Sequence, residues 1–124
     1  VDVVLPQGEV FGVDVNPRLT TSYVGLRQLG DFNIAQLLIE AALEGKLPKK
    51  IKTCGAACFS KDEVPKPILE IFEQVAQCAN IVSPPFPIES NAKACALVIG
   101  QGSNFTEAKK RLEEAKKNLQ NIIL

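Results

Sequence analysis

The sequence predicts a single domain, or a fragment of one, with an α+β or α/β fold. Three observations lead to this class. The chain of 124 residues is long enough for a hydrophobic core, and its 46% hydrophobic and 23% charged residues are typical of a globular domain. Its periodic segments also alternate between strand and helix patterns. The expected order is two strands, a helix, a strand, a helix, a strand and a helix.

An N-terminal β-hairpin is predicted from alternating apolar residues at 1–5 and 10–16, with the turn sequence PQGE between them. If the apolar residues of both strands face one core, the numbers of paired residues must sum to 16. This register puts Asp2 directly opposite Asp14 on the other face, with Asn16 two residues further along. The pairs expected on the core face are Val1 with Val15, Val3 with Val13, and Leu5 with Phe11.

The middle of the chain reads as an irregular segment followed by a helix. Residues 17–30 are rich in Thr, Ser and Gly and are expected to lack regular structure. Asp31 or Asn33 can then cap a helix that runs to about Glu44, where the sequence GKLP ends it. The apolar stripe expected to face the core consists of Ile34, Leu37, Leu38, Ala41 and Ala42.

A strand is predicted at about residues 51–59, where small and apolar side chains predominate. A helix follows from about Lys66 to Ala79, because prolines mark its start and apolar residues recur at helical spacing. Its expected core face is formed by Ile68, Ile71, Phe72, Val75 and Ala79. The prolines of the sequence SPPFP, residues 83–87, predict a stiff connector.

The last two elements have the clearest patterns. The run ACALVIG, residues 94–100, predicts a buried strand. After it, Asn104 and Glu107 form a variant of the capping box at the start of an amphipathic helix. The expected core face of that helix is formed by Phe105, Ala108, Leu112, Ala115, Leu119 and Ile122.

Composition excludes several classes of function. The formal net charge is zero, with 14 basic and 14 acidic residues, which argues against a nucleic-acid partner. No apolar run approaches the roughly 20 residues needed to span a bilayer, so no membrane partner is expected, and no signal peptide is recognised. The chain contains no methionine and opens inside an expected strand, which suggests the C-terminal part of a longer polypeptide. Nothing in the sequence decides whether it forms a homo-oligomer.

The four cysteines are expected to be buried, reduced thiols in a cytoplasmic protein. The chain has no histidine and no paired C-x-x-C spacing, which disfavours a zinc site. The positions are Cys54, Cys58, Cys78 and Cys95.

The opposed carboxylates of the hairpin predict a magnesium site. Like charges directly opposite across two strands are destabilising unless something compensates them. A divalent cation with oxygen ligands would do so, and Asp2, Asp14 and the amide oxygen of Asn16 supply three such oxygens. The alternative is that both carboxylates lie on the solvent face of a hairpin. The segment that follows favours the metal, because Arg18 and the hydroxyls of Thr20, Thr21 and Ser22 suit phosphate groups.

These residues resemble the C-terminal lobe of the ATP-grasp ligases. In that family an acid on one strand is followed about a dozen positions later by an acid-x-Asn pair, often continuing as NPR. Asp2 matches the first acid, Asp14 to Asn16 the pair, and Arg18 the arginine. The longer string VNPRLTTSYVGLRQ is similar to archaeal ATP-grasp proteins that include tyramine–glutamate ligases. The resemblance is strongest over residues 1–45.

The resemblance implies an α+β lobe with a mostly antiparallel sheet and flanking helices, whose upstream half is absent. It implies that Asp2, Asp14 and Asn16 bind Mg²⁺, or Mn²⁺ in its place, together with the phosphates of ATP. Arg18 would lie near the transferred γ-phosphate as a catalytic residue, and Thr20, Thr21 and Ser22 would contact substrate or phosphate. The implied reaction joins a carboxylate to an amine through an acyl phosphate. The alternative is a non-catalytic α+β module that binds a small ligand or a subunit.

Overall fold

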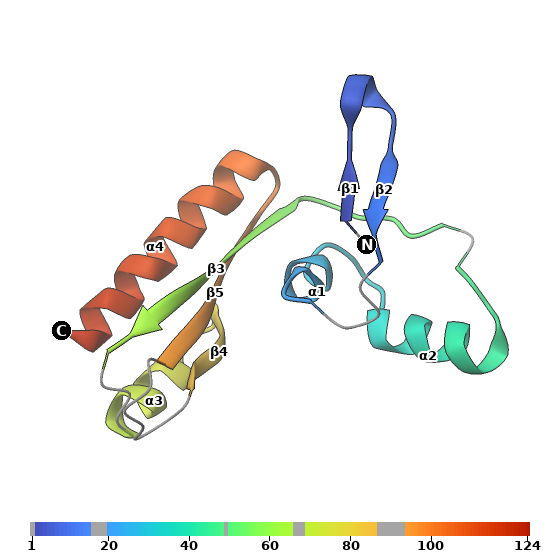
Figure 1. Ribbon diagram of the computed structural model, residues 1–124. Helices are drawn as coiled ribbons and strands as arrows, with labels where there is room; N and C mark the ends of the chain where they lie inside the picture. Colours follow the sequence, from blue (N-terminus) through green and yellow to red (C-terminus); the bar gives the residue numbers. More distant parts are fainter. Residues whose placement is uncertain (1, 16–19, 49, 66–68, 87–93) are drawn as a thin grey trace.

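The computed structural model describes residues 2–15, 20–48, 50–65, 69–86 and 94–124. The fold is α+β, as the sequence predicts. The described residues form a two-stranded hairpin, a three-stranded antiparallel sheet and four α-helices. The hairpin stands apart from the larger sheet, whose strands are packed against the C-terminal helix (Figure 1).

The larger sheet has β5 (Ala94–Gly102) at its centre, between β3 (Ala56–Val64) and β4 (Ile81–Phe86). The strand expected at 94–100 is therefore confirmed. The strand expected at 51–59 is displaced, because β3 begins at Ala56 and continues to Val64. Its limits are set by unbroken pairing with β5, from Ala56 opposite Gly102 to Val64 opposite Ala94.

The connector predicted from the sequence SPPFP is wrong, because most of it belongs to the strand β4. Proline cannot donate a ladder hydrogen bond, so it is tolerated in edge strands and at bulges. Both conditions hold here. β4 lies at the edge of the sheet, and its pairing with β5 shifts register between Ile81 and Ser83 and again between Ser83 and Phe86.

The helix α4 (Phe105–Ile123) covers one face of the sheet and supplies much of the core. Its apolar stripe is buried as expected, except that Phe105 is exposed and Ile122 is half-buried. Phe105 is the first residue of the helix, and its side chain is 66% exposed. The buried cluster consists of Val64, Val75, Ile81, Ala94, Ala96, Val98, Leu112, Ala115 and Leu119.

The helix α3 (Leu69–Ala76) lies within the predicted range 66–79 and packs against β4 and α4. Of its expected core residues, Val75 is buried, Ile71 and Phe72 are half-buried, and Ala79 is exposed beyond the end of the helix. Phe72 meets Phe86 edge to face, with ring centroids 5.6 Å apart. Ile68 lies outside the described residues.

The N-terminal half contains α1 (Ser22–Leu26) and α2 (Ile34–Glu44). The cap and the end of α2 are confirmed: the Asn33 side chain accepts a hydrogen bond from the backbone of Gln36, and Gly45 is left-handed. The irregular segment expected at 17–30 instead contains α1. The expected burial of the α2 stripe is wrong, because no residue of this helix is buried and Leu38 is 50% exposed.

The cysteine expectation holds in part. All four are free thiols. Cys54 is exposed, because it lies two residues before β3 begins, and the other three are half-buried rather than buried. Within the described part of the chain, none of the helices is both long and apolar enough to cross a membrane.

The α4 cap differs slightly from a standard capping box. The Asn104 side chain accepts a hydrogen bond from the Glu107 backbone at 3.0 Å, as predicted. The Glu107 carboxylate reaches back one residue further than expected, to the backbone and hydroxyl of Ser103 at 2.8 and 2.7 Å. Replacing Asn104 with alanine should therefore lower the free energy of unfolding by about 1 kcal/mol. Urea denaturation measures this, and Asn118→Ala, on the exposed face of the same helix, serves as the control.

Glu107 should make stability depend on pH. Its hydrogen bonds from Ser103, followed by the charge of Arg111, hold the pKa of this carboxyl below its ordinary value. The stabilisation is therefore fully present above the unfolded pKa of about 4.3 and is lost as the pH falls through the lower folded pKa. Glu107→Gln should reduce the loss of stability on acidification, whereas Glu114→Gln should retain it. Thermal unfolding between about pH 2 and 6 measures the difference.

Candidate functional site

The hairpin consists of β1 (Asp2–Val4) and β2 (Phe11–Asp14), and it confirms the central prediction that Asp2 pairs with Asp14. Directly opposite residues have Cβ atoms about 4.5–5.5 Å apart. Beyond this pair the register shifts, so that Val3 is opposite Gly12 and Val4 is opposite Phe11. The predicted pairs of Val3 with Val13 and of Leu5 with Phe11 are therefore wrong.

The shift leaves Val13 as the extra residue of a β-bulge, next to the two carboxylates. The turn is also longer than expected and contains a single 3₁₀ turn at Pro6–Gly8, with Gln7 at a φ of 54°. The longer turn shifts the pairing next to it by one residue from the predicted register. The extra residue Val13 offsets this shift, so Asp2 lies opposite Asp14 as predicted. The pairs between the bulge and the turn therefore differ from the prediction, whereas the acidic pair does not.

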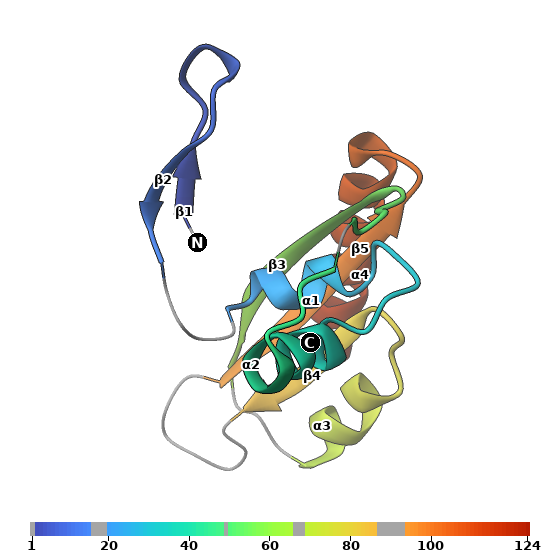
Figure 2. The same ribbon diagram turned by 90° about the vertical axis from the view of Figure 1, so that its right-hand side faces the viewer.

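The expectation that the hairpin contributes to a core is also wrong. The hairpin forms a separate sheet, and Leu5, Phe11, Val13 and Val15 are each at least half exposed. Figures 1 and 2 show it projecting away from the packed C-terminal half in both views. The side chains of Asp2 and Asp14 are exposed as well.

The donor chemistry at the acidic pair fits magnesium. Both described residues of the predicted metal site are carboxylates, which are the hard oxygen donors that this ion prefers. One oxygen of Asp14 accepts a hydrogen bond from the Val15 backbone at 2.8 Å, which fixes the orientation of the group. In the described ranges no group of three or more His, Cys, Asp or Glu could hold a metal. A metal at this pair would thus need other oxygens, such as an amide or phosphates.

The other predicted site residues are distributed along the chain after the hairpin. Asn16 and Arg18 lie outside the described residues. Thr20 and Thr21 are exposed immediately before α1, and Ser22 is its first residue. The Thr20 and Thr21 carbonyls accept the backbone hydrogen bonds of Tyr23 and Val24, both at 3.0 Å. The Thr21 side chain makes no capping hydrogen bond to α1.

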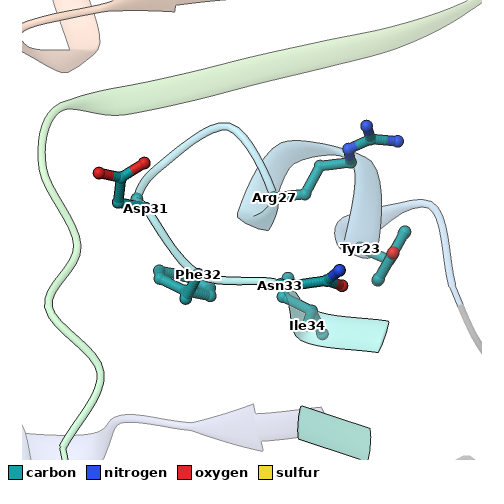
Figure 3. A pocket seen from close by; sticks show the side chains of 7 residues that line it. Tyr23, Arg27, Asp31, Phe32, Asn33 and Ile34 are labelled. Atoms are coloured by element: carbon teal, nitrogen blue, oxygen red, sulfur yellow. The ribbon is translucent and has the colours of Figure 1, made fainter. Parts of the chain in front are cut away.

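A pocket that the sequence did not reveal lies directly after these hydroxyls. It is formed between α1 and the start of α2 and has a volume of about 410 Å³. Figure 3 shows Tyr23 and Arg27 contributed by the α1 side, and Asp31, Phe32 and Asn33 by the loop that leads into α2. The only available signal was the spacing of Tyr23 and Arg27, which puts four-apart residues on one side of a helix.

Comparison with protein-family models, with curated proteins and with solved structures finds no match. The local geometry and chemistry of the hairpin and of the α1–α2 pocket therefore carry the functional argument.

Proposed function

We propose that this chain is the C-terminal lobe of an ATP-dependent carboxylate–amine ligase of the ATP-grasp type. The single observation that carries the proposal is the cross-strand pair of Asp2 and Asp14. Two carboxylates directly opposite each other repel, and a divalent cation bound between them would compensate their charge. The match to the family's spaced acid, acid-x-Asn and Arg motif adds to it.

In the proposed reaction, Asp2, Asp14 and Asn16 would hold Mg²⁺, or Mn²⁺ in its place. When bound, that ion neutralises the phosphate charge of ATP. Arg18 would orient the γ-phosphoryl group and stabilise its charge during transfer to the substrate carboxylate. The hydroxyls of Thr20, Thr21 and Ser22 would position substrate or phosphate. Catalysis of this kind depends on positioning and charge, so it requires no histidine, and the chain has none.

The distribution of apolar surface supports a lobe that is completed by other polypeptide. Every buried residue of the core cluster lies between Val64 and Leu119. By contrast, Phe11, Ile39 and Leu43, in the hairpin and α2, are 50%, 58% and 81% exposed. Exposed apolar side chains in this number are consistent with a surface that another polypeptide covers. In the proposed enzyme, the half that carries the adenine-binding segment would cover this surface, and the whole would act in the cytoplasm.

The test is isothermal calorimetry of ATP binding to the full-length protein, with and without Mg²⁺. Asp14→Ala and Asn16→Ala should both abolish most of the Mg²⁺-dependent gain in affinity. Glu9→Ala is the matched control, since it removes an exposed carboxylate from the same hairpin without touching the acidic pair. An unchanged Mg²⁺-dependent affinity in both site variants would exclude the metal assignment.

The second candidate function is a non-catalytic module that binds a small ligand or a subunit. The observation that favours it is the pocket beside α1, which is within the usual range of small-molecule sites. This candidate predicts ligand binding without any Mg²⁺-dependent affinity for ATP. The same calorimetry therefore distinguishes the two functions.

A further inference from the structure

The two edges of the larger sheet differ in how well they could pair with another strand. The β4 edge is interrupted, because Pro84 and Pro85 lie within the strand and its register shifts twice. The β3 edge is regular: the strand pairs with β5 over nine residues without a break, contains no proline or glycine, and has no residue with a positive φ. A regular edge strand of this length is a template for pairing with another chain.

Among the described residues, the outer edge of β3 has no partner strand. β5 is its only neighbour in the described sheet (Figure 1), and none of the described backbone hydrogen bonds of loops, turns and caps involves residues 56–64. The helix α1 contacts side chains on one face of this strand, since a Cβ atom at Gly25 would be 3.2 Å from the Phe59 ring and 3.9 Å from the Ala57 side chain. About half of the backbone N–H and C=O groups of β3 therefore point away from β5, along the open edge.

A second copy of β3 fits this edge best when the two strands run antiparallel about Ser60. The numbers of paired residues then sum to 120, so all nine residues pair, whereas every other register pairs fewer. No like charges are directly opposite, because Lys61 faces Phe59 and Glu63 faces Ala57. Moving the centre by one residue toward the C-terminus would set two lysines against each other, and moving it by two would do the same to two aspartates.

A buried carboxylate oxygen on β3 supports the same register. The Oδ1 atom of Asp62 accepts a hydrogen bond from the Ser60 hydroxyl at 2.8 Å and lies 4.0 Å from the Lys116 Nζ atom. The Oδ2 atom is buried and has no hydrogen-bond partner in the part of the chain that the structure describes, although buried oxygens are usually satisfied. In the pairing about Ser60, Asp62 faces Cys58 of the second copy, and Cys58 is a free thiol. Its S–H group can donate a hydrogen bond to that oxygen.

We propose that the outer edge of β3 binds the same edge of a second copy of this chain, antiparallel about Ser60, in a two-fold dimer with one continuous six-stranded sheet. The strand order would be β4-β5-β3 in one copy, followed by β3-β5-β4 in the other. Backbone hydrogen bonds across the β3–β3 junction supply the affinity, as in other cases of strand addition. The acidic pair of the hairpin takes no part, so the dimer does not depend on the proposed ligase function.

The first test is a disulfide across the two-fold axis. In full-length protein carrying Cys54→Ser, which removes the exposed thiol, Ser60→Cys should form a disulfide-linked dimer on mild oxidation. Directly opposite residues have Cβ atoms about 4.5–5.5 Å apart, close to the spacing that a disulfide spans. Ser83→Cys is the matched control, since Ser83 is also a half-buried serine of an edge strand, β4. On a non-reducing denaturing gel, equal cross-linking of the two variants overturns the proposal, and so does the absence of cross-linking at Ser60.

The second test changes the charge opposite Glu63. Ala57→Glu would set two carboxylates opposite each other at two places in the dimer, whereas Ala57→Lys would set an ammonium group opposite each carboxylate. The Kd of the dimer should therefore be at least about tenfold higher for Ala57→Glu than for Ala57→Lys, and adding Glu63→Lys to Ala57→Glu should restore the affinity. Because Ala57 is half-buried, circular dichroism of both variants verifies that the fold is intact.

Sedimentation equilibrium of the full-length protein, without ATP or Mg²⁺, measures the dimer, for which we expect a Kd of about 10 μM. A protein that stays monomeric at about 200 μM overturns the proposal and would mean that another segment of polypeptide covers β3. Equal dissociation of Ala57→Glu and Ala57→Lys also overturns it. A β3 dimer without Mg²⁺-dependent ATP binding would retain this interface and reject the ligase, and ATP binding by a monomer would do the reverse.

Discussion

Gly100→Ala should lower the free energy of unfolding by about 3 kcal/mol, at the upper end of the range for overpacking. Gly100 lies in β5 directly beneath α4, where a Cβ atom would be 2.3 Å from both the Ala108 carbonyl oxygen and the Leu112 nitrogen. Both are backbone atoms, so no side chain can rotate away. The helix would have to move off the sheet, which would loosen the contacts of Leu112 with the core.

Urea denaturation measures the effect, and Gly12→Ala provides a control for the loss of glycine itself. Gly12 is also in a strand, but a Cβ atom there has nothing within 4 Å. That variant should stay within about 0.5 kcal/mol of the unmodified protein. Equal stability of the two variants would contradict the close packing of α4 on β5.

Asp2→Asn should affect the protein in opposite directions with and without metal. Without divalent cations it should raise stability by about 0.2–1 kcal/mol, because it removes one of two like charges that lie directly opposite. With Mg²⁺, the substitution should weaken ATP binding at least about tenfold. The proposed Mg²⁺ site would lose one carboxylate, so the ion that neutralises the phosphates of ATP would be held less tightly. No purely structural role of Asp2 predicts this reversal.

Thermal unfolding in chelator and calorimetry with Mg²⁺–ATP measure the two effects on the same preparation. Glu9→Gln is the matched control, because it neutralises another exposed hairpin carboxylate that does not face Asp14. A decrease in stability without metal would mean that the pair is stabilised by something other than a cation. Unchanged ATP affinity would reject Asp2 as a ligand.

Local chemistry made several elements predictable. The caps of α2 and α4 depend on hydrogen bonds within one turn, from Asn33 to Gln36 and from Asn104 to Glu107. The amphipathic period of α4 is likewise a property of the sequence alone. The acidic pair was also predicted, but from a register that holds only at Asp2 and Asp14, because a β-bulge at Val13 offsets the longer turn.

Strand limits were harder to predict, because a strand extends as far as its partner allows. β3 reaches Val64 since β5 is available to pair with it, although its sequence from Ser60 to Glu63 is polar. β4 tolerates Pro84 and Pro85 because it is an edge strand with shifted register. Neither fact can be read from a window of a few residues.

The sequence by itself therefore determined the mixture of strands and helices and the helices that Asn33 and Asn104 cap, and it predicted that Asp2 faces Asp14, although the bulge that brings this about was not foreseen. Tertiary structure alone decided that the hairpin and α2 leave their apolar faces exposed, and that Arg27 and Asp31 share a pocket. The physical reason is the distance along the chain between the residues that interact. Caps and alternation depend on neighbours within a few residues, whereas burial and pocket formation depend on contacts between distant segments, such as the bond from Gln101 to Gln28.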